Sequence, residues 1–204
     1  MTTRTIALAT AAAIAAALLA GCTTTPSGMP GTGMGPNVSS SPEASPSPSS
    51  DAHNNADLMF TMMMIPHHEQ AVEMADMIIG KTGIDPKITA LAQKIKDAQQ
   101  PEITQMEGWL DTWGVGDAND MMDDMDHGTG MMSDGDMSEL ESAAGDGAGR
   151  VFLNQMIEHH EGAIDMATDE VEDGQNPDTV ALANNITTSQ TAEIAVMKGL
   201  LSAG

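Results

Sequence analysis

The chain of 204 residues contains no tyrosine, two phenylalanines, two tryptophans and one cysteine, and only seven of its residues are lysine or arginine. Since alternating β-branched and aromatic runs are absent, no β-sheet is expected. A single cysteine forms no intramolecular disulfide and builds no cysteine-based metal site. Thirty acidic residues give a formal net charge of −23, which repels nucleic-acid phosphates and anionic membrane surfaces. We therefore expect no nucleic-acid partner, whereas cations are attracted.

The amino-terminal segment has the features of a bacterial export signal. Arg4 precedes an alanine-rich apolar run at residues 6–20, which is too short to span a bilayer as a stable helix. The run ends in Leu-Ala-Gly-Cys22, which resembles the lipobox, where cleavage precedes a cysteine that receives lipid. We predict a lipoprotein-type signal peptide at residues 1–21 and a protein exported and lipid-anchored through Cys22 to the outer face of a bacterial membrane. A soluble secreted protein is the alternative.

The composition then changes twice along the chain. Residues 22–54 are rich in Ser, Pro and Gly with little apolar content, so they are predicted to form a disordered tether. Residues 55–204 carry regular apolar patterns and are long enough to bury a core. We predict one folded domain there.

This domain contains an internal repeat. Residues 60–75 and 152–167 are nearly the same, and each carries His-His-Glu with one Met three residues before the first His and another seven residues after it. The similarity continues for about 50 residues, and each unit has two helix-like stretches joined by a short turn. Asp85-Pro86 and Asn176-Pro177 are typical of an N-cap followed by proline at the first helical position. The sequence predicts an all-α four-helix bundle built from two repeated helical hairpins.

Three local features qualify this prediction. Pro66 and Pro101 lie inside the helical patterns, where kinks or breaks are expected. A capping-box pattern at residues 138–141 predicts a short helix before the long helix that begins near Ala148. Residues 117–137 are rich in Met, Asp and His and are predicted to form a loop.

The repeated motif contains donors for transition metals. On a helical wheel His68 lies at the centre of the apolar face, His67 lies with Met74 at its edge, and Glu69 points away. His160, His159 and Met166 repeat this arrangement. On the second helix of each unit, Gln, Glu and Met share a face at residues 99, 102 and 106 and at residues 190, 193 and 197. Whether these faces oppose the histidines is left open by the sequence.

Imidazole and thioether together suit Cu(I), and by extension Ag(I), whereas Mg²⁺ and Ca²⁺ prefer oxygen ligands. A single Met or His in a helix is more often a core residue, but the duplication favours a metal site. The candidate ligands in the helices are Met64, His67, His68, Met74, Met106, Met156, His159, His160, Met166 and Met197. Weaker candidates lie in the loop, namely Met121, Met122, Met125, His127, Met131 and Met132.

Together with Gln99, Glu102, Met106 and Trp109-Leu110, the two His-His-Glu segments resemble a bacterial family catalogued as domain of unknown function 305, over about residues 55–201. The resemblance implies a ferritin-like four-helix bundle, exported from the cytoplasm, in a family with members that bind copper and contribute to copper tolerance. It favours the methionines and histidines of residues 64–74 and 156–166 as ligands. Asp57 fits an aspartate common in the family, whereas Gly149 departs from it.

Three functions are therefore considered. The first is capture or buffering of copper at the cell envelope without catalysis, with transfer to a partner protein as a further possibility. The second is a ferritin-like metal-dependent oxidase, but di-iron sites use Glu-x-x-His, which occurs in neither unit. The third is a structural or interaction module whose Met and His side chains only pack. The sequence favours the first, with no catalytic constellation.

Overall fold

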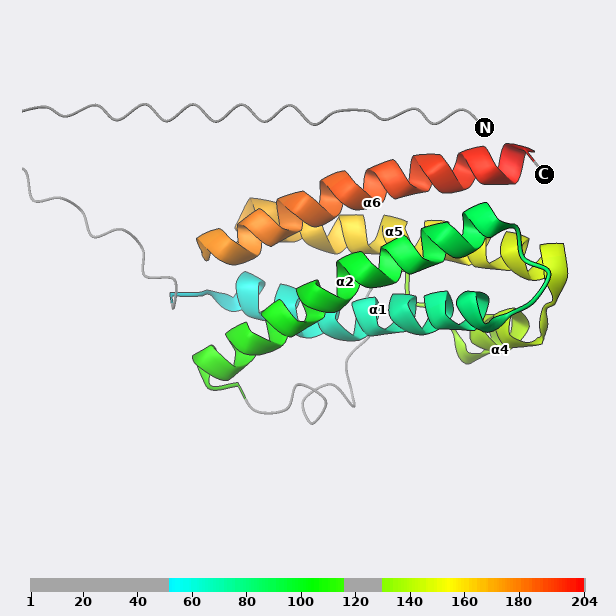
Figure 1. The fold of residues 1–204 in the computed structure, drawn as a ribbon. Coiled ribbons are helices and arrows are strands. Elements are labelled where there is room, and N and C mark those ends of the chain that lie inside the picture. The colour runs from blue at the N-terminus through cyan, green and yellow to red at the C-terminus, as the bar shows by residue number, and fades with distance from the viewer. Residues whose placement is uncertain (1–51, 116–129, 204) are drawn as a thin grey trace, which may run out of the picture. The chain divides into compact units, whose positions relative to one another are not determined.

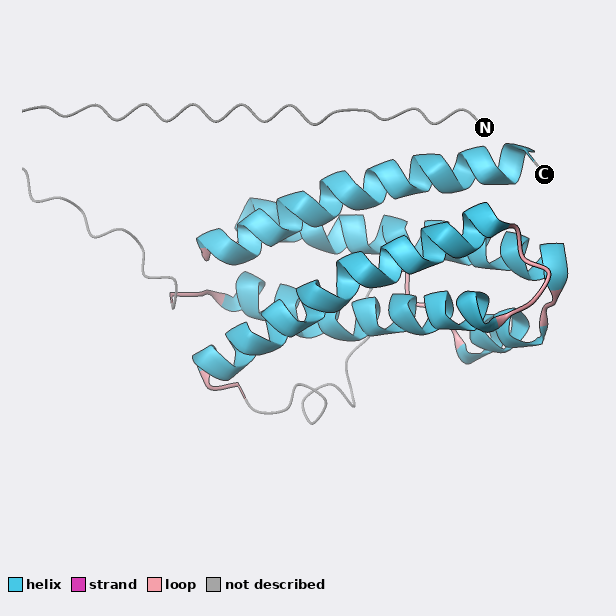
Figure 2. Cartoon of the chain, in the orientation of Figure 1, coloured by secondary structure: helices cyan, strands magenta, loops and turns pink. Residues whose placement is uncertain are grey.

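The computed structural model describes residues 52–115 and 130–203, in which all regular elements are helices. In chain order these are α1 (Asn55–Gly80), α2 (Pro86–Trp113), α4 (Asp134–Ser142), α5 (Gly145–Asp173) and α6 (Pro177–Ala203). The helices α1 and α2 form one hairpin, α5 and α6 form the other, and the short α4 packs beside α1 and α5 (Figures 1 and 2). The predicted all-α bundle is confirmed. None of the described helices is long and apolar enough to cross a membrane.

The helix starts follow the predicted capping chemistry. The Asp85 side chain accepts a hydrogen bond from the Lys87 amide, with Pro86 at the first position of α2. The Asn176 side chain does the same for the second and third amides of α6. In α1, Asn54 and Asp57 form a reciprocal capping box. These side chains satisfy amides that have no partner within the helix, and each contributes about 1 kcal/mol.

Several local predictions need correction. Of the kinks or breaks expected at Pro66 and Pro101, the breaks are excluded, because α1 and α2 continue through both prolines. The short helix begins at Asp134 rather than near residue 138, since Ser133 and Asp136 form the capping box. Residues 134–137, predicted as loop, are therefore helical, and α5 begins at Gly145, three residues before Ala148. The signal peptide, nearly all of the tether and loop residues 117–129 lie outside the described residues.

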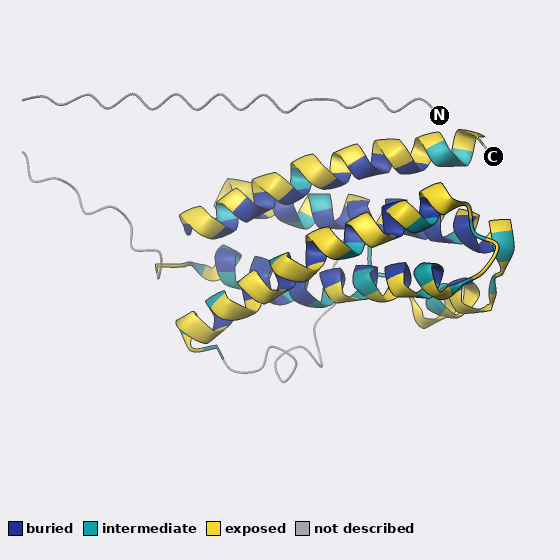
Figure 3. Cartoon of the chain, in the orientation of Figure 1, coloured by how far each residue is buried: buried dark blue, intermediate teal, exposed yellow. Residues whose placement is uncertain are grey.

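The core consists of two apolar clusters, one toward each end of the bundle. The helices turn their buried faces toward one another along their whole length (Figure 3). One cluster contains the second half of α1 and the first half of α5, including Ile78 and Phe152. The other contains the first half of α1 and the second half of α5, including Phe60 and Ala167. Between the two clusters each long helix carries polar residues instead.

Short polar contacts attach α4 to the two histidine-bearing helices. The Gln70 amide donates to the Met132 carbonyl at 2.9 Å and accepts from the Met132 amide at 2.7 Å. Gln155 donates to the Asp136 carbonyl at 2.8 Å. The start of this segment approaches α5 closely, because a Cβ added at Gly130 would lie 2.8 Å from the Cα of Gly162. This part of the α1 and α5 surface is thus covered.

A buried carboxylate joins the ends of three helices at one end of the bundle. Asp57 is fully buried and accepts hydrogen bonds from the Asn176 amide and the Thr179 hydroxyl, both at 2.8 Å. Burial acts to raise the pKa of Asp57, but hydrogen bonds from Asn54, Asn176 and Thr179 lower it below its usual value. Glu170 of α5 lies beside this carboxylate; its burial, reinforced by the Asp57 charge, raises the pKa of Glu170 to about 7.

Candidate metal centre

Polar side chains from all four long helices meet between the two apolar clusters, and we call them the polar layer. The helices α1 and α5 contribute the two histidine pairs, and α2 and α6 contribute one glutamine and one glutamate each. Its members are His67, His68, Gln99, Glu102, His159, His160, Gln190 and Glu193. All four histidines are fully buried, and only the Glu102 side chain has substantial exposure, at 22 %.

Each hairpin forms the same histidine–glutamate pair. His68 Nε2 lies 2.9 Å from Glu102 Oε2, and His160 Nε2 lies 3.0 Å from Glu193 Oε2. The faces of α2 and α6 whose direction the sequence left open therefore do oppose the histidines. When the carboxylate is ionised it accepts a hydrogen bond, so Nε2 carries the proton and Nδ1 of the neutral ring keeps its lone pair. A carboxylate holding the far nitrogen of an imidazole is the usual support of a metal-binding histidine.

The other two histidines meet between the hairpins. The rings of His67 and His159 are 3.7 Å apart between centroids and tilted by 42°. Because these positions are equivalent in the repeat, the contact is isologous, as across a twofold axis. The wheel placed His67 at the edge of the apolar face, but it is fully buried. The reason is that α1 packs against α2 on one side and against α5 on the other, so two of its faces are covered.

Burial favours the uncharged form of the two histidines on α5. The pKa of His159 is lowered well below 6.5, first by burial and then by the neighbouring histidines His67, His160 and His68. Burial also lowers the pKa of His160, although Glu193 opposes the change. A metal ligand must be the neutral imidazole, so these rings are already in the form that binds.

The two hairpins differ in how they hold the glutamate. The Lys94 ammonium lies 3.2 Å from Glu193 Oε1. Burial acts to raise the pKa of Glu193, but His160 and Lys94 together lower it. The position equivalent to Lys94 in the second unit is Asn185, so no lysine is repeated for Glu102. Sequence reasoning missed Lys94, since an isolated lysine in a helix gives no signal of its partner.

Several ring and amide atoms of the layer have no hydrogen-bond partner among the described residues. They are Nδ1 of His68 and of His160 and both side-chain amide atoms of Gln99. A buried polar atom without a partner costs about 1–3 kcal/mol. Buried nitrogen and oxygen lone pairs without a hydrogen-bond partner are consistent with a site in which they bind a metal ion.

Thioethers lie on both sides of the layer. Met64 and Met106 are fully buried in the apolar cluster at one side, and Met74, Met156 and Met197 are fully buried in the cluster at the other. Met64 and Met156 each lie one turn before a histidine pair. No three His, Cys, Asp or Glu side chains within residues 52–115 and 130–203 form a group that could hold a metal ion. Sulfur donors therefore have to be counted with the imidazoles.

The remaining predicted ligands lie elsewhere. Met166 is half-buried and lines a surface pocket rather than the layer. Met132 is buried where α4 begins, and Met131 beside it is half-buried. The loop candidates Met121, Met122, Met125 and His127 lie outside the described residues.

The protein is thus a helical bundle with histidines and supporting glutamates across its middle and buried thioethers on either side of them. The chain belongs to the DUF305 family, since the model described as domain of unknown function (DUF305) matches residues 57–201. The resemblance seen in the His-His-Glu segments is thereby confirmed.

Solved structures of the same family share the fold. A DUF305 protein from Streptomyces coelicolor, described as secreted, is 33 % identical, covers 76 % of this chain and 95 % of its own, and superposes with a TM-score of 0.66. A DUF305 fragment from Deinococcus radiodurans is 27 % identical with coverages of 74 % and 98 % and a TM-score of 0.63. CopM in its Cu(I)-bound form is 31 % identical with coverages of 72 % and 96 % and a TM-score of 0.61. It has also been solved with Cu(II) and with Ag. No curated protein matches the chain.

Proposed function

We propose that this protein is an exported copper-binding protein that captures and buffers Cu(I) at the cell envelope and thereby contributes to copper tolerance. The observation that carries the proposal is the polar layer. Four buried histidines meet there, and glutamates orient two of them, His68 and His160, so that Nδ1 is available.

The donor set favours a soft ion. Imidazole nitrogen with thioether sulfur suits Cu(I), and Ag(I) by the same chemistry, more than Zn²⁺ or the hard divalent ions. The likeness to CopM, which is solved with copper and with silver, supports this choice. We assign the layer histidines as ligands, together with the buried thioethers on either side of the layer, Met64, Met74, Met106, Met156 and Met197.

We place the protein outside the cytoplasm, tethered by lipid on Cys22. The signal-like segment at residues 1–21 supports export, as does the secreted relative. Changing Cys22 to Ala should move the protein from the membrane fraction to the soluble fraction of cells. Unchanged membrane association in that variant would refute the anchor and leave the metal site untouched.

The binding proposal is tested by anaerobic titration of the full chain with Cu(I) against a chromophoric chelator. A variant with all four layer histidines changed to Ala should lose the tight equivalents, while a His53→Ala variant, changed outside the layer, should keep them. Circular dichroism would check that both variants are folded. A second variant, Met64→Leu with Met156→Leu, preserves side-chain volume and should weaken binding without loss of fold. Equal affinity in every variant would instead support the structural-module function.

A catalytic alternative is tested separately. Two histidine–glutamate pairs across facing helices are ligands that iron also accepts. If the protein is an oxidase, anaerobic iron loading followed by oxygen should produce an oxo-bridged absorption band. We expect no such band, because neither unit contains Glu-x-x-His.

A further inference from the structure

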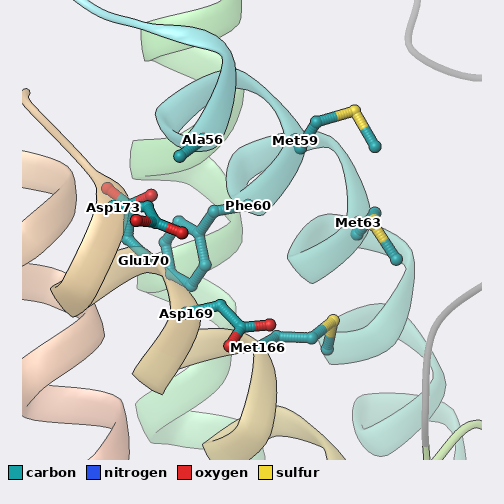
Figure 4. A pocket seen from close by; sticks show the side chains of 8 residues that line it. All are labelled: Ala56, Met59, Phe60, Met63, Met166, Asp169, Glu170 and Asp173. Atoms are coloured by element: carbon teal, nitrogen blue, oxygen red, sulfur yellow. The ribbon is translucent and has the colours of Figure 1, made fainter.

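A pocket of about 170 Å³ opens between α1 and α5, away from the polar layer. Its lining combines sulfur and carboxyl groups from two helices with one aromatic ring (Figure 4). The lining residues are Ala56, Met59, Phe60, Met63, Met166, Asp169, Glu170 and Asp173.

Three thioethers line this pocket. Met59 and Met63 lie one turn apart on α1, and Met166 lies opposite them on α5 (Figure 4). Met59 is 38 % exposed, and the other two are half-buried. Exposed methionine is both apolar and prone to oxidation, so packing alone gives little reason for it. Its flexible side chain lets sulfur atoms from two helices approach one ion.

The carboxyl groups make the pocket attractive to a cation. Asp169 and Asp173 are exposed one turn apart on α5, and no lysine or arginine lines the pocket. Glu170 is only 1 % exposed and lies beside the Asp57 carboxylate. Negative groups around a partly enclosed cavity raise the local concentration of positive ions.

The other half of the repeat does not reproduce this pocket. Val151 and Gln155 stand where α1 has Met59 and Met63, and Lys81 stands where α5 has Asp173. Gln155 there hydrogen-bonds to α4, and the Lys81 ammonium donates to the Glu141 carbonyl. The thioether and carboxyl groups are therefore particular to this half and do not follow from the duplicated bundle.

We propose that the pocket is a second metal site, which binds a soft monovalent cation, Cu(I) or Ag(I), through the thioethers of Met59, Met63 and Met166. Asp169 and Asp173 supply attraction rather than the soft ligands. Thioether donors select these ions over Zn²⁺, Ca²⁺ and Mg²⁺. The site is reached from solvent, whereas the layer histidines are fully buried. It shares no ligand with the layer and goes beyond the proposed function.

The test uses the full chain labelled with ¹³C at the methionine methyl groups, titrated separately with Ag(I) and with Cu(I) under anaerobic conditions. Methyl signals of the three pocket methionines should shift with either ion. The triple variant Met59→Leu, Met63→Leu and Met166→Leu should bind one equivalent fewer at saturation. Whichever ion shows this loss is the ion that the pocket takes.

A matched control changes three methionines outside the pocket, Met62, Met77 and Met137, to Leu and should keep every equivalent. A variant with the four layer histidines changed to Ala should keep the methyl shifts of the pocket. Loss of metal binding at the polar layer is thereby distinguished from loss of metal binding in the pocket. The proposal is overturned if the pocket variant binds as much metal as the unchanged protein, or if the control variant loses the same equivalent.

Discussion

Glu170 makes the stability of the bundle depend on pH in a way that one substitution should remove. The side chain is 1 % exposed, and burial raises its pKa from 4.5 to about 7. In the folded state the carboxyl therefore holds a proton up to about pH 7, whereas in the unfolded chain it is ionised above pH 4.5. Over this window the folded state binds more protons, so this group's contribution to the free energy of unfolding falls as pH rises.

The size of the effect follows from the same pKa. A rise of the Glu170 pKa from 4.5 to about 7 lowers the free energy of unfolding by about 3 kcal/mol when the pH is raised from below 4.5 to 8. Glutamine has nearly the same shape and no charge, so Glu170→Gln removes this loss. Relative to the unchanged protein, the variant should gain about 3 kcal/mol between pH 4.5 and pH 8, or very roughly 10 °C in Tm.

Urea denaturation followed by circular dichroism at pH 4.5, 6 and 8 measures this difference. Comparing the two proteins at each pH cancels the titration of all other groups. Glu172→Gln is the matched control, because Glu172 is exposed on the same turn of α5, and it should show no pH-dependent difference. If Glu170→Gln changes the free energy of unfolding equally at all three pH values, the reasoning from the buried carboxyl is wrong.

Three further predictions concern the layer and the attachment of α4. Because the pKa of His159 lies well below 6.5 in the folded state, the unfolded chain binds more protons than the folded chain under mild acid. Through this residue the free energy of unfolding of the metal-free protein should fall by up to about 1.4 kcal/mol for each pH unit below 6.5. Denaturation of the protein and of a His159→Gln variant measures the difference. Gly130→Ala should cost about 2 kcal/mol or more in urea denaturation, because φ is +89° and the new Cβ would meet the Gly162 backbone at 2.8 Å; an unchanged midpoint would contradict that approach. Gln70→Ala removes both hydrogen bonds to Met132 and should cost about 1–3 kcal/mol and speed amide exchange in α4, whereas unchanged exchange would show that α4 is held otherwise.

The bundle could be predicted from the sequence because the strongest signals are periodic and occur twice. The N-caps at Asp85 and Asn176 are local and were predicted correctly. The predicted start of α4 was wrong, because Asp136 rather than a glutamate completes the capping box with Ser133. Aspartate at that position makes the same hydrogen bond but is not part of the usual pattern.

The site was predictable in its residues and less so in its geometry. The sequence placed His68 on the inward face but left open whether Glu102 opposes it, and in the structure Glu102 is its partner. The burial of His67 depends on where a second hairpin packs, which a wheel of one helix does not contain. Met166 shares its motif with His159 but is half-buried and lines a surface pocket, which the motif alone does not indicate.

The contact between the equivalent rings of His67 and His159 has a consequence for descent. A single hairpin of about 50 residues supplies only half of the layer, so the complete centre exists only at the seam between two copies. When two copies are joined in one chain, the residues at the ends of the bundle can change in one copy and not in the other, while the residues at the contact between the hairpins are kept. The ends have diverged, since the buried Asp57, Glu170 and Thr179 correspond to Gly149, Ile78 and Ile88 in the other copy. The histidine pairs have not.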